Sequence, residues 1–358
     1  MVKSAYIHIP FCKSKCKYCS FISFTEHSKT NECIESLLYD INYNYSGETL
    51  DTIYFGGGTP SLLSPFCIKK IIDKFKISSN CEITFEMNPD DVKIEYLNAL
   101  FEIGINRISL GAQTFDDNVL KLIGRRHNSK QIFDSVELLK KVGFSNLSLD
   151  LIYGLPNVNI EQDLNIITDL GVQHISTYGL KIEENSFWGK FLPENLPNED
   201  EQADMYLMVN EYLEKKGYKR YEISNFAIDG YESKHNLNYW NNNEYYGFGL
   251  AAHGYINDCR YSNTEILNKY IVNPRTSKKS LTLTPQEQLE EEIFLGFRKA
   301  EGINVNEIQK KFDILFNVKY KNVLDKYMPD YIEQTPAGYK LTIKGVLLSN
   351  LILSEFIE

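Results

Sequence analysis

Three cysteines near the N-terminus, Cys12, Cys16 and Cys19, follow one another with spacings typical of a metal-binding loop. Thiolates are soft ligands, so three of them this close together predict a soft metal centre. A structural zinc site usually has four ligands, often as two pairs, and no fourth cysteine or histidine stands at such a spacing. An iron–sulfur cube has four irons to ligate. Three cysteines would leave one iron open to a substrate or cofactor, which favours a 4Fe–4S cluster over zinc.

The other four cysteines are scattered along the chain and are interpreted as small buried apolar residues. They are Cys33, Cys67, Cys81 and Cys259. The total of seven is odd, and the apolar stretch at the N-terminus is too short for a signal peptide, so a disulfide framework is disfavoured. No apolar run approaches the roughly 18 residues of a membrane span. We therefore expect the protein in the reducing cytoplasm.

The composition is that of a folded globular protein, with 358 residues, 43% hydrophobic and 24% charged. This length predicts about two domains, or one barrel with an appendage. The net charge is −10, which argues against non-specific binding of nucleic acid. We expect no nucleic-acid partner.

The first half of the chain alternates short β-rich runs with longer segments of helical periodicity. The predicted strands cover residues 4–9, 52–55, 82–86, 107–110, 146–152 and 174–178. The predicted helices between them cover residues 31–44, 66–75, 93–103, 130–142 and 161–170. This repeat is typical of βαβ units and a parallel sheet. It predicts an α/β fold with a partial, TIM-like (β/α)6 barrel, and a doubly wound open sheet stays an alternative.

Polar or glycine-rich residues follow almost every predicted strand. The clearest are Gly56-Gly57-Gly58-Thr59-Pro60 after the second strand and Glu86-Met87-Asn88-Pro89 after the third. In barrels and open α/β sheets, ligands bind at the carboxyl ends of the strands. The repeated signal therefore predicts one shared site at this edge.

The pattern changes after about residue 195, and we divide the chain into residues 1–195, 196–284 and 285–358. The middle region is predicted to hold a helix at 200–216 and a strand at 222–226. Its residues 234–250 are rich in Asn, Tyr, Trp and Gly. In the last region we expect helices at 285–297, 305–312 and 343–357 and a hairpin about 336–338. This order is similar to a winged helix, so an α+β extension ending in a winged-helix-like domain is predicted.

The cysteine pattern, with the aromatic Tyr18 just before Cys19, resembles the radical S-adenosylmethionine (SAM) superfamily. The resemblance implies a partial barrel holding a 4Fe–4S cluster. It also implies that the open iron chelates the amino and carboxylate groups of SAM. Electron transfer from the cluster then cleaves SAM to methionine and a 5′-deoxyadenosyl radical.

The same resemblance implies roles for further residues in binding SAM. Gly57, Gly58 and Thr59 would meet its methionine moiety, because glycines let a backbone approach a ligand closely. Gln113 and Asp150 would contact the ribose hydroxyls.

Charged and aromatic residues complete the implied SAM site. Glu86 would pair with the ammonium group of SAM, and Arg125 with its carboxylate. Whether Arg125 or the adjacent Arg126 faces inward stays open at this point. Tyr6 and Tyr18 would flank the cluster and the adenine.

Four longer stretches resemble one branch of the superfamily, which contains oxygen-independent coproporphyrinogen III oxidase and the heme chaperone HemW. They cover residues 6–12, 55–61, 111–115 and 150–156. The oxidase has a further cysteine two residues after the last cluster cysteine, where this chain has Phe21. It also has a long arm before its first cluster cysteine, whereas Cys12 here is preceded by only 11 residues. Both differences favour the HemW side of the branch.

The segment His235-Asn236-Leu237-Asn238-Tyr239-Trp240 is similar to the His-Asn-x-x-Tyr-Trp motif of HemW, whose histidine is implicated in holding heme. A neutral imidazole is a good axial ligand for heme iron. In a helix, His235 and Tyr239 would share one face, with the apolar plane of Trp240 beside them. His253 is a second candidate ligand.

The resemblance therefore implies a heme chaperone that binds a 4Fe–4S cluster, SAM and heme and delivers heme to hemoproteins. The alternative is an enzyme of porphyrin biosynthesis, an oxygen-independent coproporphyrinogen III oxidase. A homodimer formed through the cysteine-rich loop and a peripheral contact with a membrane both stay open.

Overall fold

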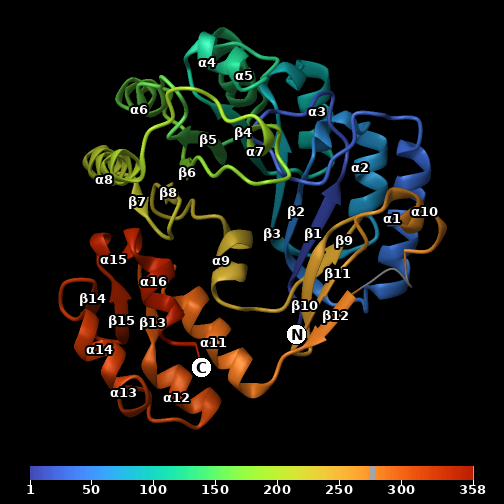
Figure 1. Cartoon of the computed structure of the whole chain (residues 1–358). Helices are drawn as coiled ribbons and strands as arrows, with labels where there is room; N and C mark the ends of the chain where they lie inside the picture. The colour runs from blue at the N-terminus through green and yellow to red at the C-terminus, as the bar shows by residue number, and fades with distance from the viewer. Residues whose placement is uncertain (275–278, 358) are drawn as a thin grey trace.

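The computed structural model describes residues 1–274 and 279–357, and its largest element is one sheet of nine strands (Figure 1). In order across the sheet these are β7 (Lys219–Arg220), β8 (Asn225–Ala227), β6 (His174–Gly179), β5 (Leu147–Tyr153), β4 (Arg107–Gln113), β3 (Lys76–Met87), β2 (Thr49–Gly57), β1 (Ser4–Ile9) and β9 (Tyr246–Phe248). Strands β1 to β6 pair in parallel, and β9 is parallel to β1. The predicted parallel α/β core is confirmed. In the part of the chain that the structure describes, the edge strands β7 and β9 do not pair, so the barrel is open.

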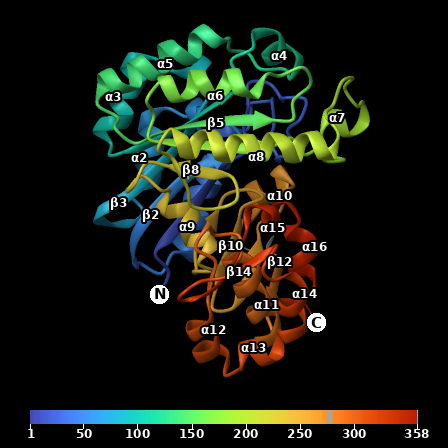
Figure 2. The same ribbon diagram turned by 90° about the vertical axis from the view of Figure 1, so that its left-hand side faces the viewer.

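Helices connect the parallel strands and cover the outer side of the sheet (Figures 1 and 2). They are α1 (Thr30–Asn44), α2 (Pro65–Ile72), α3 (Ile94–Glu102), α4 (Asp117–Leu122), α5 (Ser129–Val142), α6 (Ile160–Asp169) and α8 (Glu199–Lys215). The short helices η1 (Pro60–Leu62), η2 (Pro89–Asp91) and α7 (Phe187–Lys190) lie at strand ends or in loops. None of the described helices has the length and apolar character needed to cross a membrane.

Helix α5 shows how local sequence sets these boundaries. The Asn128 side chain accepts a hydrogen bond from the backbone N–H of Gln131, and the Gln131 side chain accepts one from the Asn128 N–H, which forms a capping box. Gly143 ends the helix in a left-handed conformation that glycine adopts without strain. Ile132 and Val136, one turn apart, are buried against the core.

The C-terminal part forms a second core below the main sheet (Figure 2). Its helices are α11 (Pro285–Gly296), α12 (Val305–Phe312), α13 (Phe316–Lys319), α14 (Lys321–Tyr327), α15 (Ile343–Leu347) and α16 (Ser349–Ser354). A three-stranded sheet joins them, made of β13 (Ile303–Asn304), β15 (Gly338–Leu341) and β14 (Ile332–Gln334). Phe297, Phe316 and Phe356 are fully buried at its centre. Strands β14 and β15 are the hairpin predicted about residues 336–338.

Two further elements lie between these cores. Helix α9 (Lys234–Trp240) sits between the main sheet and α11 (Figure 1). A small antiparallel sheet, β10 (His253–Ile256), β11 (Cys259–Ser262) and β12 (Lys279–Thr282), follows β9, with α10 (Leu267–Val272) inserted in it.

Two predicted elements are wrong in detail. The strand predicted at 222–226 is confirmed only for Asn225 and Phe226, which belong to β8. Residues 222–224 lie in the turn between β7 and β8, where the buried carboxylate of Glu222 accepts hydrogen bonds from the Ser224 N–H and the Asn225 side chain. The single helix predicted at 343–357 is divided into α15 and α16 at Leu348. Strand β9 was not predicted at all, since three buried residues carry too short a pattern.

Candidate functional site

A cavity of about 500 Å³ lies at the carboxyl ends of the parallel strands. All three clustered cysteines line it, together with eight of the nine side chains or glycines expected to bind SAM. Those eight are Tyr18, Gly57, Gly58, Thr59, Glu86, Gln113, Arg125 and Asp150. The structure therefore brings residues from six separate segments to one edge of the sheet.

The cysteine loop is folded back on itself next to the sheet. The Cys12 N–H donates to the Phe24 carbonyl at 3.0 Å, and the Phe24 N–H donates to the Pro10 carbonyl at 2.8 Å. Farther along, the Lys17 N–H donates to the Ile123 carbonyl at 2.9 Å, which ties the loop to the end of α4. These backbone hydrogen bonds help to hold the thiols at the cavity wall.

The three thiols are free, partly exposed and placed beside hydrogen-bond donors. The Thr59 hydroxyl lies 3.5 Å from Cys12 Sγ, and Arg125 Nη1 lies 3.6 Å from Cys16 Sγ. No three His, Cys, Asp or Glu side chains of the described residues converge on one point as ligands of a single metal ion. A cube does not need that, because each thiolate binds a different iron. The donor set therefore fits an iron–sulfur cluster better than a mononuclear metal.

The glycines at the end of β2 are required by close packing. Gly57 has φ 103°, a left-handed conformation, and a Cβ there would lie 2.5 Å from the His8 ring. A Cβ on Gly58 would lie 2.6 Å from the Phe11 carbonyl oxygen. Only glycine lets this strand end pass directly beside the cysteine loop.

Asn88 links the two sides of the cavity. Its Oδ1 accepts a hydrogen bond from Arg125 Nη2 at 2.7 Å, and its Nδ2 donates to Thr59 Oγ1 at 3.2 Å. Arg125 also donates to the Gly111 carbonyl. The guanidinium is thereby fixed between the cluster loop and the strand ends, with Nη1 turned toward Cys16.

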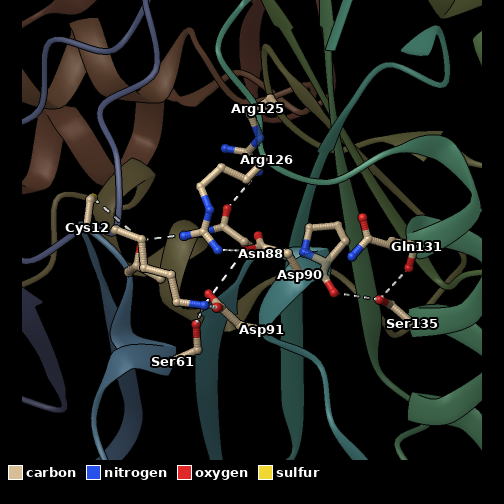
Figure 3. A network of polar contacts seen from close by, with 12 residues as sticks. Cys12, Ser61, Asn88, Asp90, Asp91, Arg125, Arg126, Gln131 and Ser135 are labelled. Carbon is tan, nitrogen blue, oxygen red and sulfur yellow. Dashed lines mark hydrogen bonds and ion pairs between the residues drawn. The ribbon is translucent and has the colours of Figure 1, made fainter. Parts of the chain in front are cut away.

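Arg126 turns away from this cavity. It pairs with Asp90, which also lies 3.7 Å from Lys13 Nζ. Lys13 in turn pairs with Asp91, and the Ser61 hydroxyl donates to Asp91 at 2.8 Å (Figure 3). This outer network anchors the cysteine loop to η2, and of the two arginines only Arg125 faces the expected SAM site.

Glu86 stands at the cavity wall next to Tyr54. The Tyr54 hydroxyl donates to Glu86 Oε1 at 2.8 Å. Burial raises the pKa of Glu86 to about 7, while the hydrogen bond from Tyr54 acts in the opposite direction. The carboxylate is therefore charged above about pH 7 and becomes neutral below it.

Asp150 and Gln113 lie across the cavity on neighbouring strands. The Ser109 hydroxyl lies 3.2 Å from Asp150 Oδ1, and burial raises the pKa of the Asp150 carboxyl. Gln113 has a φ of 72°, at the point where the register of β4 and β5 shifts. Both side chains can accept hydrogen bonds from a polyhydroxyl ligand.

Tyr6 is the expected SAM residue that the structure places elsewhere. Its hydroxyl is hydrogen-bonded to His8 Nδ1 at 3.0 Å, and among the described residues it does not contribute to the cavity wall. Since side chains alternate along β1, Tyr6 shares a face of the strand with His8.

His235 is buried at the opposite end of the strands, with only 1% of its surface exposed. Its Nδ1 is hydrogen-bonded to Thr52 Oγ1 at 2.7 Å and its Nε2 to the Tyr239 hydroxyl at 2.8 Å. Burial lowers the pKa of His235 to about 3, so the ring is neutral. In this conformation both ring nitrogens are occupied, and an iron cannot reach either of them.

The other expected heme residues are more accessible. Tyr239 and Trp240 are partly exposed on α9, and His253 is exposed at the start of β10. The role of His235 as an axial ligand stays a prediction, and it requires α9 to leave the sheet.

Tyr54 and Asn88 are among the residues of the site that were not assigned roles from the sequence. Asn88 stands in the strand-end segment that begins at Glu86, so its position after a predicted strand could have identified it as a residue of the site. Tyr54 stands inside β2, and only its alternation with Thr52 places it on the inner face.

Comparisons with known proteins agree with this geometry. Residues 6–170 match the radical SAM superfamily, and residues 283–348 match the HemN C-terminal domain. The heme chaperone HemW of Lactococcus lactis is 38% identical over 99% of this chain and 97% of its own. That of Escherichia coli is 36% identical over 99% of this chain and 98% of its own. The chain belongs to the HemW family of radical SAM proteins.

The fold agrees with a solved structure of the same branch. Coproporphyrinogen III oxidase (HemN) from Escherichia coli superimposes with a TM-score of 0.86 at 22% identity, over 99% of this chain and 90% of that one. Membership of the radical SAM superfamily implies a 4Fe–4S cluster and SAM as cofactors. The cysteine loop and the strand-end cavity of this HemW family member provide thiolates and polar groups of the kinds these cofactors need.

Proposed function

We propose that this protein is a heme chaperone, which holds a 4Fe–4S cluster and SAM in the strand-end cavity and delivers heme to hemoproteins of the cytoplasm. The observation that carries the proposal is the match to HemW proteins over 99% of the chain. The cavity supports it, because three thiols, a buried carboxyl and a fixed guanidinium meet there.

The chain's own residues would bind and orient the two cofactors. Cys12, Cys16 and Cys19 would ligate the cluster, and Glu86 and Arg125 would hold the amino and carboxylate groups of SAM. When bound, the cluster supplies the electron that radical SAM chemistry uses. The fixed position of Arg125, bonded to Asn88 and Gly111, means that little side-chain entropy is lost when SAM binds.

Phe21 distinguishes the chaperone from the oxidase. It lies at the cavity wall, 66% exposed, where the oxidase sequence pattern has a cysteine. A phenyl ring offers apolar contact and no thiolate. The overall superposition on the oxidase, at 22% identity, concerns the fold alone.

An anaerobic experiment on the cluster-loaded protein separates these two functions. We expect incubation with heme to give a stable Soret band, and transfer of that heme to an apo-hemoprotein. We expect incubation with coproporphyrinogen III, SAM and a reductant to give no vinyl groups by mass spectrometry. Vinyl formation without stable heme binding would establish the oxidase instead.

We further propose His235 as an axial ligand of the bound heme, reached when α9 leaves the sheet. The His235→Ala variant should then shift the Soret maximum and release heme readily to a competing apoprotein. Hydrogen exchange of the α9 amides should accelerate when the wild-type protein binds heme. The cluster absorbance should be unchanged, because the cysteines lie at the other end of the strands.

The matched variant for this experiment is His253→Ala, since His253 is the exposed histidine that follows α9. An unchanged spectrum in His235→Ala together with a shifted one in His253→Ala would assign the iron to His253.

A homodimer through the cysteine loop is a separate part of the proposal. It predicts that the mass in solution falls when the cluster is removed.

A further inference from the structure

Helix α9 and the cavity lie at opposite ends of the same strands, and one side chain touches both. Thr52, which contacts α9, pairs in register with Ser4, the first residue of β1. Glu86 lies two residues beyond Thr84, the register partner of Tyr54. Along the strand direction, Tyr54 therefore lies between Thr52 at the α9 end and Glu86 at the cavity end. Its side chain is on the inner face of β2.

The tyrosine makes a different contact in each direction. Toward the cavity, its hydroxyl donates to Glu86 Oε1 at 2.8 Å. Toward α9, its ring faces the His235 imidazole with 5.1 Å between ring centroids and 30° between the planes. The ring of Tyr54 therefore rests on His235 while its hydroxyl holds the carboxyl.

His235 is itself held on every side. Thr52 and Tyr239 occupy its two ring nitrogens at 2.7 and 2.8 Å. Its backbone N–H donates to Glu82 Oε1 at 3.1 Å, and the Lys234 N–H donates to Glu82 Oε2 at the same distance. A buried side chain with this many contacts is a rigid support.

We propose that Tyr54 is a positioning residue for Glu86, and that His235 holds Tyr54 in place, so that α9 sets the affinity of the cavity for SAM from the far end of the strands. The proposal rests on the proposed function, since it takes Glu86 as the partner of the SAM amino group. It gives His235 a role in the heme-free protein.

The charged state of Glu86 links this geometry to a measurement. Burial raises its pKa to about 7, and the hydrogen bond from Tyr54 lowers it. The other groups that face it are Asp150, which raises the pKa further, Arg107, which lowers it, and the neutral hydroxyls of Tyr6 and Tyr239. The amino group of SAM donates its N–H hydrogen bonds to the charged form, so affinity should fall as pH falls through about 7.

The test is a calorimetric titration of SAM into cluster-loaded protein between pH 6 and 9. Tyr54→Phe keeps the ring on His235 but loses the donor, so Glu86 should lose its charge at a higher pH. We expect affinity about tenfold weaker than wild type at pH 7, and nearly equal affinity at pH 9. His235→Ala should move the profile in the same direction, because Tyr54 loses its support.

His174→Ala is the matched control, a second fully buried histidine near the start of a parallel strand. Its ring nitrogens are bonded to Ser148 at 2.7 Å and Tyr221 at 2.8 Å. We expect it to lower stability without moving the pH profile. The proposal would be overturned if SAM affinity depended on pH in Tyr54→Phe as it does in the wild type. Equal shifts of this pH dependence in His174→Ala and His235→Ala would also overturn it.

A second measurement keeps this proposal separate from the proposed function. The pKa of Glu86 can be followed by carbon-13 NMR in cluster-free protein, wild type and Tyr54→Phe. A higher pKa of Glu86 in Tyr54→Phe supports the positioning role, even if SAM does not bind. Failure of SAM to bind would contradict only the proposed function. An unchanged pKa overturns the positioning role.

Discussion

Replacing Cys16 by alanine should abolish assembly of the 4Fe–4S cluster. Two thiolates do not hold the cube, and the described cavity offers no fourth cysteine to take the vacant place. The same loss is expected for Cys12→Ala and Cys19→Ala. Iron and sulfide analysis after anaerobic reconstitution, with the visible absorbance of the cluster, measures the effect.

The matched control is Cys67→Ala, a partly buried cysteine on α2 that lies outside the cavity. It should assemble a full cluster, as should variants of Cys33, Cys81 and Cys259. A cluster lost in any of these four, or retained in Cys16→Ala, would show that the set of ligands differs from the three clustered cysteines.

Replacing Arg125 by alanine should weaken SAM binding by about 1.5–3 kcal/mol, the range for a hydrogen bond to a charged group. This corresponds to a roughly tenfold to hundredfold higher Kd. The guanidinium lies at the cavity wall with Nη1 3.6 Å from Cys16 Sγ, so its loss removes a fixed, charged hydrogen-bond donor for the SAM carboxylate there. Calorimetric titration of SAM into cluster-loaded protein gives the Kd of the wild type and of Arg125→Ala directly.

Arg126→Ala provides the comparison, because Arg126 differs from Arg125 by one position and points to the outer network. Its partner is Asp90, and its side chain is 39% exposed. We expect at most a small change in the Kd for SAM. A larger loss in Arg126→Ala than in Arg125→Ala would mean that SAM approaches from the outer face of the loop.

Much of the site was predictable because parallel strands impose a common geometry. Their carboxyl ends must meet at one edge, so residues that follow different strands converge even when they are far apart in sequence. Gly57, Glu86 and Asp150 were placed correctly at the cavity on that basis. The spacing of the cysteines was sufficient for the cluster, since a short loop leaves three thiols little freedom to separate.

The sequence was less informative wherever the direction of one side chain decides its role. Arg125 and Arg126 are chemically identical neighbours, and only the position of Asn88 and Asp90 on either side of them determines which one enters the cavity. Tyr6 was expected beside the cluster, but alternation along β1 directs it to His8. The strand predicted at 222–226 begins only at Asn225, because the buried carboxylate of Glu222 accepts a hydrogen bond from the Ser224 N–H and holds residues 222–224 in a turn.

The sequence by itself thus determined the family, the cluster loop and the edge of the sheet at which ligands bind, because these depend on spacing and on the order of strands. Only the tertiary structure decided the state of His235. Its motif predicts a free imidazole, whereas packing against Thr52, 183 residues earlier in the chain, occupies Nδ1 and buries the ring. A hydrogen bond between residues so distant forms only after the sheet and α9 have come together, and a local sequence pattern contains no information about it.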